Sequence, residues 1–301
     1  MILETPSGAL HGTLELPEGD PPFPAALIVA GSGPTDRDGN STLLPGRNDS
    51  LKMLAAALAH AGVASLRYDK RGIGESAPAG VDEARMTFDL SVDDAVAWLD
   101  VLASDDRFDR LVVLGHSEGS LVGMLAAARV RAAAFVSLEG AGRPAADVLR
   151  SQLGAQLPPA LLEDVDGVLR ELEAGRTATE LPASVAAVPS IGQGLFRASV
   201  RPYLVSWFRV DPTRAIADLE VPALVVQGTT DLQVPRSDGE ALAAATRHGT
   251  LALIEGMNHV LKLAPADRDA NLAAYSDPSL PLAPALVEAL GSFLRSNGLA
   301  G

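Results

Sequence analysis

The chain has 301 residues, of which 47% are hydrophobic and 21% charged, enough for a large buried core in one elaborated domain or a core with an insertion. Its formal net charge of −14 argues against nucleic acid and anionic membranes as partners, because both attract basic surfaces. The absence of cysteine excludes disulfides, zinc-thiolate sites and a thiol nucleophile.

Short apolar runs alternate with helical patterns along most of the chain. We expect strands at residues 2–5, 9–16, 25–30, 63–68, 111–114, 134–138, 223–227 and 250–254. Helices are expected at residues 50–61, 89–103, 117–130, 237–246 and 284–296. This alternation predicts an eight-stranded, mostly parallel sheet with helices on both faces, in which the first two strands form an antiparallel edge.

A long segment separates the sixth and seventh expected strands. Its roughly seventy residues are too many for a plain crossover, and they include a helical pattern at 161–174. We therefore predict a helical cap at 142–211, inserted into a core of 1–141 and 212–301. Aromatic side chains are concentrated in this cap, where they could line a substrate pocket or simply pack the cap against the core: Phe196, Tyr203, Trp207 and Phe208.

The sequence Gly-His-Ser-Glu-Gly at 115–119 lies between an expected strand and an expected helix. This context favours a nucleophile elbow over a bare glycine and serine turn, because an elbow holds its serine on a sharp, crowded strand-to-helix turn. Ser117 is then the candidate nucleophile. The amide of Glu118, at the start of the helix, is a candidate oxyanion donor.

A serine nucleophile needs a base and an acid that orients the base. Asp231 follows the strand at 223–227 and His259 follows the strand at 250–254, so both should reach the carboxyl edge of the sheet with Ser117. Asp231 could instead initiate a turn or cap a helix, and Glu139, just after the sixth strand, is a rival for the acid. The remaining histidines are less suitably placed as the base: His11, His60, His116 and His248.

A glycine-rich loop at 31–39 follows the expected strand at 25–30. We assign the second oxyanion donor to the N–H of Ser32 in this loop. The alternative, phosphate binding, lacks both the Gly-x-Gly-x-x-Gly spacing and a Gly-Lys-Ser/Thr ending. Asp36, Arg37 and Asp38 are interpreted as a scaffold for the loop, and no spacing of acids favours a metal or glycosidase site.

These motifs resemble those of the α/β-hydrolase superfamily and, more narrowly, of bacterial serine esterases with a GSGPTDRDG-type oxyanion loop. The similarity extends over essentially the whole chain and includes YDKRGIGES at 68–76 and GMNH at 256–259. One departure is Ala30, where many relatives have histidine, so that support of the oxyanion loop should differ here. Asp69 and Arg71 are expected to fix their own loop, although Arg71 could instead clamp a substrate carboxylate.

The resemblance implies an α/β-hydrolase fold and hydrolysis of carboxylic esters without metal or organic cofactor. We therefore expect a serine carboxylesterase that acts on small ester substrates of short to medium chain length through an acyl-enzyme. A thioesterase or serine peptidase could use the same triad, and a ligand-binding protein could have the same fold. With no signal-peptide pattern and no apolar run of about 18 residues, the expected location is cytoplasmic.

Overall fold

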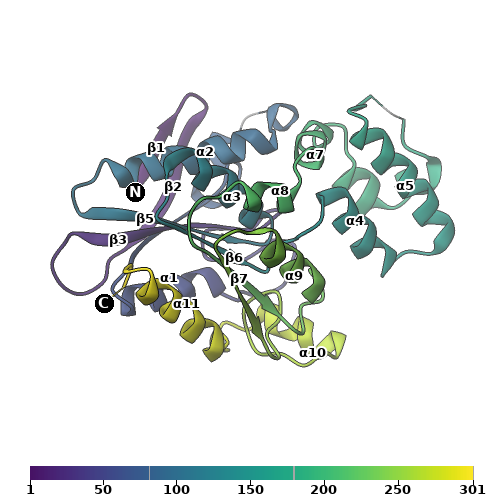
Figure 1. Ribbon diagram of the computed structural model, residues 1–301. Helices are drawn as coiled ribbons and strands as arrows, with labels where there is room; N and C mark the ends of the chain where they lie inside the picture. The colour runs from purple at the N-terminus through teal and green to yellow at the C-terminus, as the bar shows by residue number, and fades with distance from the viewer. Residues whose placement is uncertain (81, 179, 301) are drawn as a thin grey trace.

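The computed structural model describes residues 1–80, 82–178 and 180–300. These residues form an eight-stranded sheet with the order β1-β2-β4-β3-β5-β6-β7-β8 (Figure 1). Pairing is antiparallel between β1, β2 and β4 and parallel across the rest of the sheet. The predicted mostly parallel sheet with an antiparallel edge is thus confirmed. Its strands are β1 (Ile2–Thr5), β2 (Gly8–Glu15), β3 (Phe23–Val29), β4 (Ala64–Tyr68), β5 (Phe108–His116), β6 (Ala134–Leu138), β7 (Ala223–Gly228) and β8 (Gly249–Ile254).

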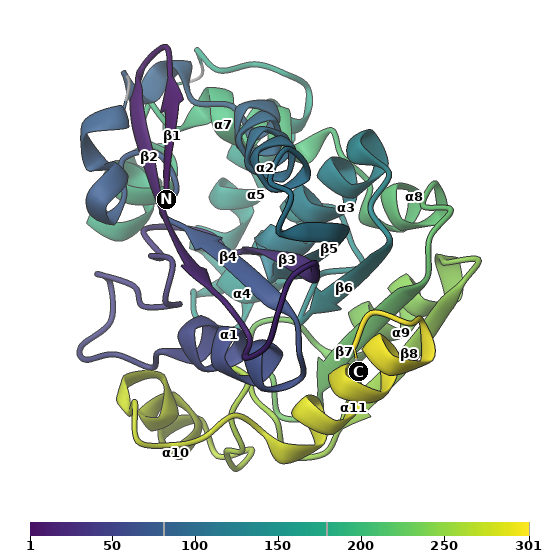
Figure 2. The same ribbon diagram turned by 90° about the vertical axis from the view of Figure 1, so that its left-hand side faces the viewer.

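Helices cover both faces of the sheet, as Figures 1 and 2 show. One face packs against α2 (Phe88–Ala103), α3 (Glu118–Val130), α8 (Pro212–Ala217) and α9 (Arg236–Ala245). The opposite face packs against α1 (Ser50–His60) and α11 (Pro284–Ser296). Shorter elements are α10 (Arg268–Ala273) and the 3-10 turns Gly74–Ala79, Glu83–Arg85 and Ala274–Ser276.

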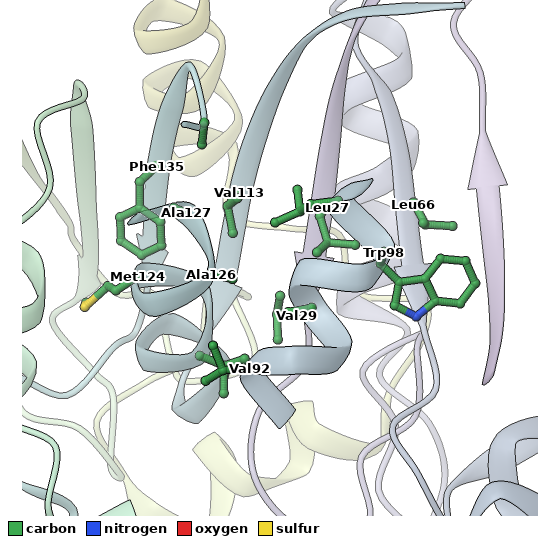
Figure 3. Packing of buried hydrophobic residues seen from close by; sticks show 14 of the residues in the cluster. Leu27, Val29, Leu66, Val92, Trp98, Val113, Met124, Ala126, Ala127 and Phe135 are labelled. Atoms are coloured by element: carbon green, nitrogen blue, oxygen red, sulfur yellow. The ribbon is translucent and has the colours of Figure 1, made fainter. Parts of the chain in front are cut away.

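The central strand β3 explains how the core forms. Successive side chains of a strand point to opposite faces, so Leu27 and Val29 pack under α2 and α3 while Ile28 packs under α1 and α11. Figure 3 shows Leu27 and Val29 in one cluster with Val92 of α2 and Val113 of β5. Full burial of each such side chain contributes about 1.5–3 kcal/mol to the stability of the fold. This packing holds the strands in place, and with them the loops at their ends.

The segment between β6 and β7 is helical and contains α4 (Ala145–Gly154), α5 (Pro159–Glu173), α6 (Ala183–Ala186), a π-helical turn at Ser190–Leu195 and α7 (Arg201–Phe208). It has an apolar cluster of its own, to which Leu169 and Leu204 belong. Figure 1 places α4 and α5 beyond one end of the sheet. The segment contacts the core at α7, where the ring of Trp207 stacks on that of Phe88 in α2 at 6.1 Å between centroids, and at Arg143, which is paired with Asp238 of α9 at 2.9 Å.

No helix among the described residues is both long and apolar enough to cross a membrane.

Candidate active site

The predicted site residues follow the carboxyl ends of four strands of the parallel part of the sheet. Ser32 lies in the loop after β3, Ser117 follows β5, Asp231 follows β7 and His259 follows β8. Parallel strands end at a common edge, and the crevice outside that edge is where open α/β sheets bind ligands. The topology therefore directs all four residues toward one region.

Ser117 occupies a strained turn between β5 and α3. Its backbone angles, φ 55° and ψ −122°, are ones that side-chain-bearing residues rarely adopt. The neighbouring glycines permit this turn. A Cβ on Gly119 would stand 2.6 Å from the carbonyl oxygen of Ala30, and a Cβ on Gly115 would stand 2.5 Å from the carbonyl carbon of Gly119. The motif therefore has glycine where the elbow contacts β3 and where strand and helix contact each other.

His259 and Asp231 form a buried pair. The Nδ1 atom of His259 lies 2.7 Å from Oδ2 of Asp231, whose side chain is 0% exposed. The other oxygen, Oδ1, accepts hydrogen bonds from the N–H groups of Gln233 (2.7 Å) and Val234 (3.0 Å). Burial acts to raise the pKa of Asp231, but His259 and these hydrogen bonds outweigh it and hold the pKa below its ordinary value. Asp231 is therefore a carboxylate that can fix the orientation of the imidazole.

The oxyanion loop and the elbow are in close contact. A Cβ on Gly31 would stand 3.1 Å from the Cβ of Ser117, so the loop after β3 lies directly against the serine. Among the described residues, the Oγ of Ser117 makes no hydrogen bond. The proposed base, His259, contacts the elbow through its carbonyl oxygen, which lies 2.7 Å from Nε2 of His116. Catalytic hydrogen bonds are often long in a ligand-free protein and tighten when substrate binds.

Two unpaired amides accompany Ser117. Within the described part of the chain, neither the N–H of Ser32 nor that of Glu118 has a hydrogen-bond partner. The amide of Glu118 opens helix α3, where the dipole favours a negative charge. Both groups therefore lack a partner within the described residues, and their role as oxyanion donors stays a prediction.

The acidic and basic residues of the oxyanion loop hold the loop itself. Asp69 Oδ1 accepts from the N–H of Arg37 (2.8 Å) and Asp69 Oδ2 from the guanidinium of Arg37 (2.7 Å). Asp36 Oδ1 accepts from the N–H of Asp38 at 2.9 Å, and Asp38 Oδ1 accepts from Nε of Arg67 at 2.9 Å. The interpretation of these loop residues as a scaffold agrees with these contacts.

Arg71 is hydrogen-bonded to α2 and β1. Its Nε donates to Asp94 Oδ2 at 2.6 Å, another nitrogen donates to Thr5 Oγ1 at 3.2 Å, and its side chain is 6% exposed. These contacts favour the role of fixing its own loop over that of a clamp for a substrate carboxylate.

The rival acid, Glu139, lies beside Asp231 rather than beside His259. Its Oε1 accepts from the N–H of Gly228 at 2.8 Å, and its carboxyl group is hydrogen-bonded to Asp231 and to Gln227. Burial and the neighbouring Asp231 charge raise the pKa of Glu139 well above its ordinary value. The raised pKa favours the protonated form of Glu139, which can donate to Asp231. The position of Glu139 after β6 did not by itself predict this contact.

The four aromatic residues of the insertion separate into two groups. Phe196 and Phe208 belong to the apolar cluster of the insertion itself. Tyr203 and Trp207 pack on the core at Phe88, and the hydroxyl of Tyr203 donates to Glu118 Oε1. Of the four, Tyr203 is therefore bonded to the elbow. A shared role as a pocket wall stays a prediction.

A hollow of about 250 Å³ lies beside the oxyanion loop, lined among others by Pro34, Asp36 and Ile73.

No cluster of three or more histidine, cysteine, aspartate or glutamate residues in the described ranges could hold a metal ion.

Comparison with known proteins finds a matching family and a curated relative. The family described as "Serine aminopeptidase, S33" matches residues 42–186. Esterase EstD of Thermotoga maritima is 28% identical over 256 residues, which cover 84% of this chain and 58% of that protein. The chain thus spans 58% of the length of this curated relative.

Solved structures match the chain over nearly its whole length. Est1E from Butyrivibrio proteoclasticus, with ferulic acid bound, is 19% identical with a TM-score of 0.61 and covers 99% of this chain and 98% of its own. The enol-lactonase from Burkholderia xenovorans LB400 is 21% identical with a TM-score of 0.58 and covers 98% of this chain and 100% of its own. With the sheet and its covering helices, these likenesses define the fold: the chain has the α/β-hydrolase fold.

Proposed function

We propose that the protein is a serine carboxylesterase that hydrolyses small carboxylic esters of short to medium chain length. The observation that carries this proposal is the buried His259–Asp231 pair at 2.7 Å, on the same sheet edge as Ser117 in its strained elbow. A binding protein of this fold has no use for a charged acid, an oriented imidazole and two unpaired amides together. The likeness to Esterase EstD adds support.

The proposed reaction has two halves. In the first, His259 accepts the proton of Ser117 as Oγ attacks the ester carbonyl carbon, and the carbonyl oxygen becomes an oxyanion held by the amides of Ser32 and Glu118. The intermediate then collapses, and the leaving alkoxide takes the proton from His259 to depart as an alcohol. Asp231 fixes the imidazole tautomer and stabilises the imidazolium.

Water completes the cycle. His259 takes a proton from water as the water oxygen attacks the acyl carbon. The second intermediate then collapses, Oγ of Ser117 leaves and takes that proton back from His259, and the carboxylic acid is released. The insertion at 142–211 is proposed as a cap that limits solvent access to this region, with Tyr203 and Trp207 on its core-facing side.

A serine peptidase is the second candidate, because the family that matches residues 42–186 is described as a serine aminopeptidase. The same triad cleaves both kinds of acyl bond. Ester and amide leaving groups must therefore be compared in one assay.

The test is hydrolysis of p-nitrophenyl acetate, butyrate, octanoate and palmitate, and of aminoacyl p-nitroanilides, by the wild type and Ser117→Ala. We expect turnover of the shorter esters and a loss on the order of 10⁴-fold or more in kcat for the variant. Preference for the anilides would favour the peptidase. A Ser117→Ala variant as active as the wild type would exclude Ser117 as the nucleophile.

A further inference from the structure

Lys70, in the loop after β4, contacts both sides of the oxyanion-loop residue Ser32. Its Nζ donates to the carbonyl oxygen of Gly31 and, at 2.9 Å, to that of Gly33. These two carbonyls bracket Ser32, whose N–H is the proposed second oxyanion donor. The carbonyl of Gly31 belongs to the same peptide unit as the N–H of Ser32, and the carbonyl of Gly33 belongs to the unit between Gly33 and Pro34. One ammonium group therefore holds the peptide that carries the proposed donor and a second peptide just after it.

Glu118, the residue after Ser117, influences Lys70 electrostatically. Burial lowers the pKa of Lys70, and the charge of Glu118 acts in the opposite direction. Burial likewise raises the pKa of Glu118, while Lys70 and the hydroxyl of Tyr203, which donates to Glu118, act to lower it. Each of the two groups therefore favours the charged form of the other.

A second side chain also holds the backbone at Ser32: Thr35 Oγ1 donates to the carbonyl oxygen of Ser32 at 2.8 Å, from within the loop. Position 30 is alanine, which has no polar group to hold the loop, and the contacts of Asp69 fix Arg37, further along. Among the described residues, the hydrogen bonds from Lys70 are the ones made by a side chain to the carbonyls of Gly31 and Gly33.

We propose that Lys70 is a positioning residue that builds the second half of the oxyanion hole, by holding the carbonyls of Gly31 and Gly33 so that the N–H of Ser32 faces the oxyanion. The inference rests on the proposed function. A lysine that served only the fold would change stability and leave transition-state binding intact. A positioning lysine changes kcat, because misplacement of a donor by about 1 Å can cost 10²-fold.

The experiment compares Lys70→Met and Lys70→Arg with Lys52→Met, which removes an exposed lysine from α1. Each variant is checked for a cooperative melting transition. The readouts are kcat and KM on p-nitrophenyl butyrate and the inhibition constant of an aryl trifluoromethyl ketone, whose hemiketal oxyanion occupies the same hole.

We expect Lys70→Met to lose about 10- to 100-fold in kcat with KM changed less than about threefold, and to bind the ketone more weakly by the same factor. Lys70→Arg should recover part of both losses, because it keeps donors for the two carbonyls, and Lys52→Met should match the wild type. If Lys70→Met folds and keeps its kcat and ketone affinity while Ser117→Ala is inactive, the proposed function stands and the role of Lys70 is overturned. A wild type inert to every ester and to the ketone would overturn both.

Discussion

The Nε2 atom of His116 lies 2.7 Å from the backbone carbonyl oxygen of His259. The contact joins the residue before the proposed nucleophile to the residue proposed as its base, and the two rings lie 4.9 Å apart between centroids. Burial and the neighbouring His259 lower the pKa of His116 to about 3. His116 is therefore neutral at physiological pH, and its Nε2–H is the donor that the carbonyl requires.

Replacement of His116 should disturb the base as well as the fold. His116→Phe keeps a ring of similar size but leaves the carbonyl of His259 buried and unpaired, a cost of about 1–3 kcal/mol. We expect this loss in the free energy of unfolding, measured with urea, together with a fall of about tenfold in kcat because His259 is less well placed. His116→Gln, which retains a donor, should lose less of both. Unchanged kcat in a His116→Phe variant of normal stability would show that the contact does not position the base.

The strain at Ser117 predicts an unusual stability order. Strained backbone conformations of this kind cost of order 1–3 kcal/mol in a residue with a side chain, and glycine avoids this cost. Glycine also loses more conformational entropy on folding than alanine does, which lowers its stability by about 0.5–1 kcal/mol. We therefore expect Ser117→Gly to be more stable than Ser117→Ala by about 0.5–2 kcal/mol in urea unfolding, with both variants inactive. A more stable alanine variant would mean that the turn relaxes without the serine.

Much of the fold could be predicted because central strands such as β3, β4, β6 and β7 are buried and form short apolar runs in the sequence. The strand expected at 134–138 is β6 as observed, and the helix expected at 284–296 is α11. The strand expected at 111–114 begins earlier, at Phe108, because pairing with Phe23 of β3 extends it through the polar residues Asp109 and Arg110. Helix α10 was not predicted. It is short and polar, and its start depends on Asp267, which accepts from the N–H of Ala270.

The site was predictable where a motif specifies a turn, and less so where two loops meet. The elbow motif made Ser117 the candidate nucleophile. Asp231 and His259 became candidates because each directly follows an expected strand. The bond between Glu139 and Asp231 depends on the adjacency of β6 and β7 in the sheet. The contact of Lys70 with Gly31 depends likewise on β4 lying beside β3. Chain order alone gives no such adjacency.

Trp207 offers a test of the pocket prediction. Its ring stacks on Phe88, so Trp207→Ala should lower stability by about 1–3 kcal/mol through lost packing. If the ring also lines the acyl pocket, the preference among p-nitrophenyl acetate, butyrate and octanoate should move toward longer chains. Leu169→Ala, which leaves a cavity in the buried cluster of the insertion, is the matched control. It should be destabilised without a change in chain-length preference. An unchanged chain-length profile for Trp207→Ala would limit this residue to packing.

The raised pKa of Glu139 should make the stability of the folded protein depend on pH. Because its pKa is raised well above the ordinary value near 4.5, the folded protein keeps a proton that the unfolded chain releases. Stability therefore falls as pH rises from the ordinary pKa toward the folded one, by up to about 1.4 kcal/mol per pH unit. Asp231 has the opposite shift: its contribution is present above its ordinary pKa near 3.8 and is lost only as pH falls through its lowered value. The two effects thus occupy different pH ranges.

Glu139→Gln separates them, because glutamine is neutral at every pH and still has an N–H donor for Asp231 and an oxygen for the N–H of Gly228. The free energy of unfolding of this variant, relative to that of the wild type, should increase as pH rises from about 5 to 8. In this range the wild type loses stability through Glu139, and the variant has no such group to titrate. Urea titrations of both proteins at several pH values measure the difference, and kcat of the variant should stay within about tenfold of the wild type because Asp231 keeps its partner. A difference that stays constant over this range would mean that Glu139 is ionised in the folded protein, so that two carboxylates face each other behind His259.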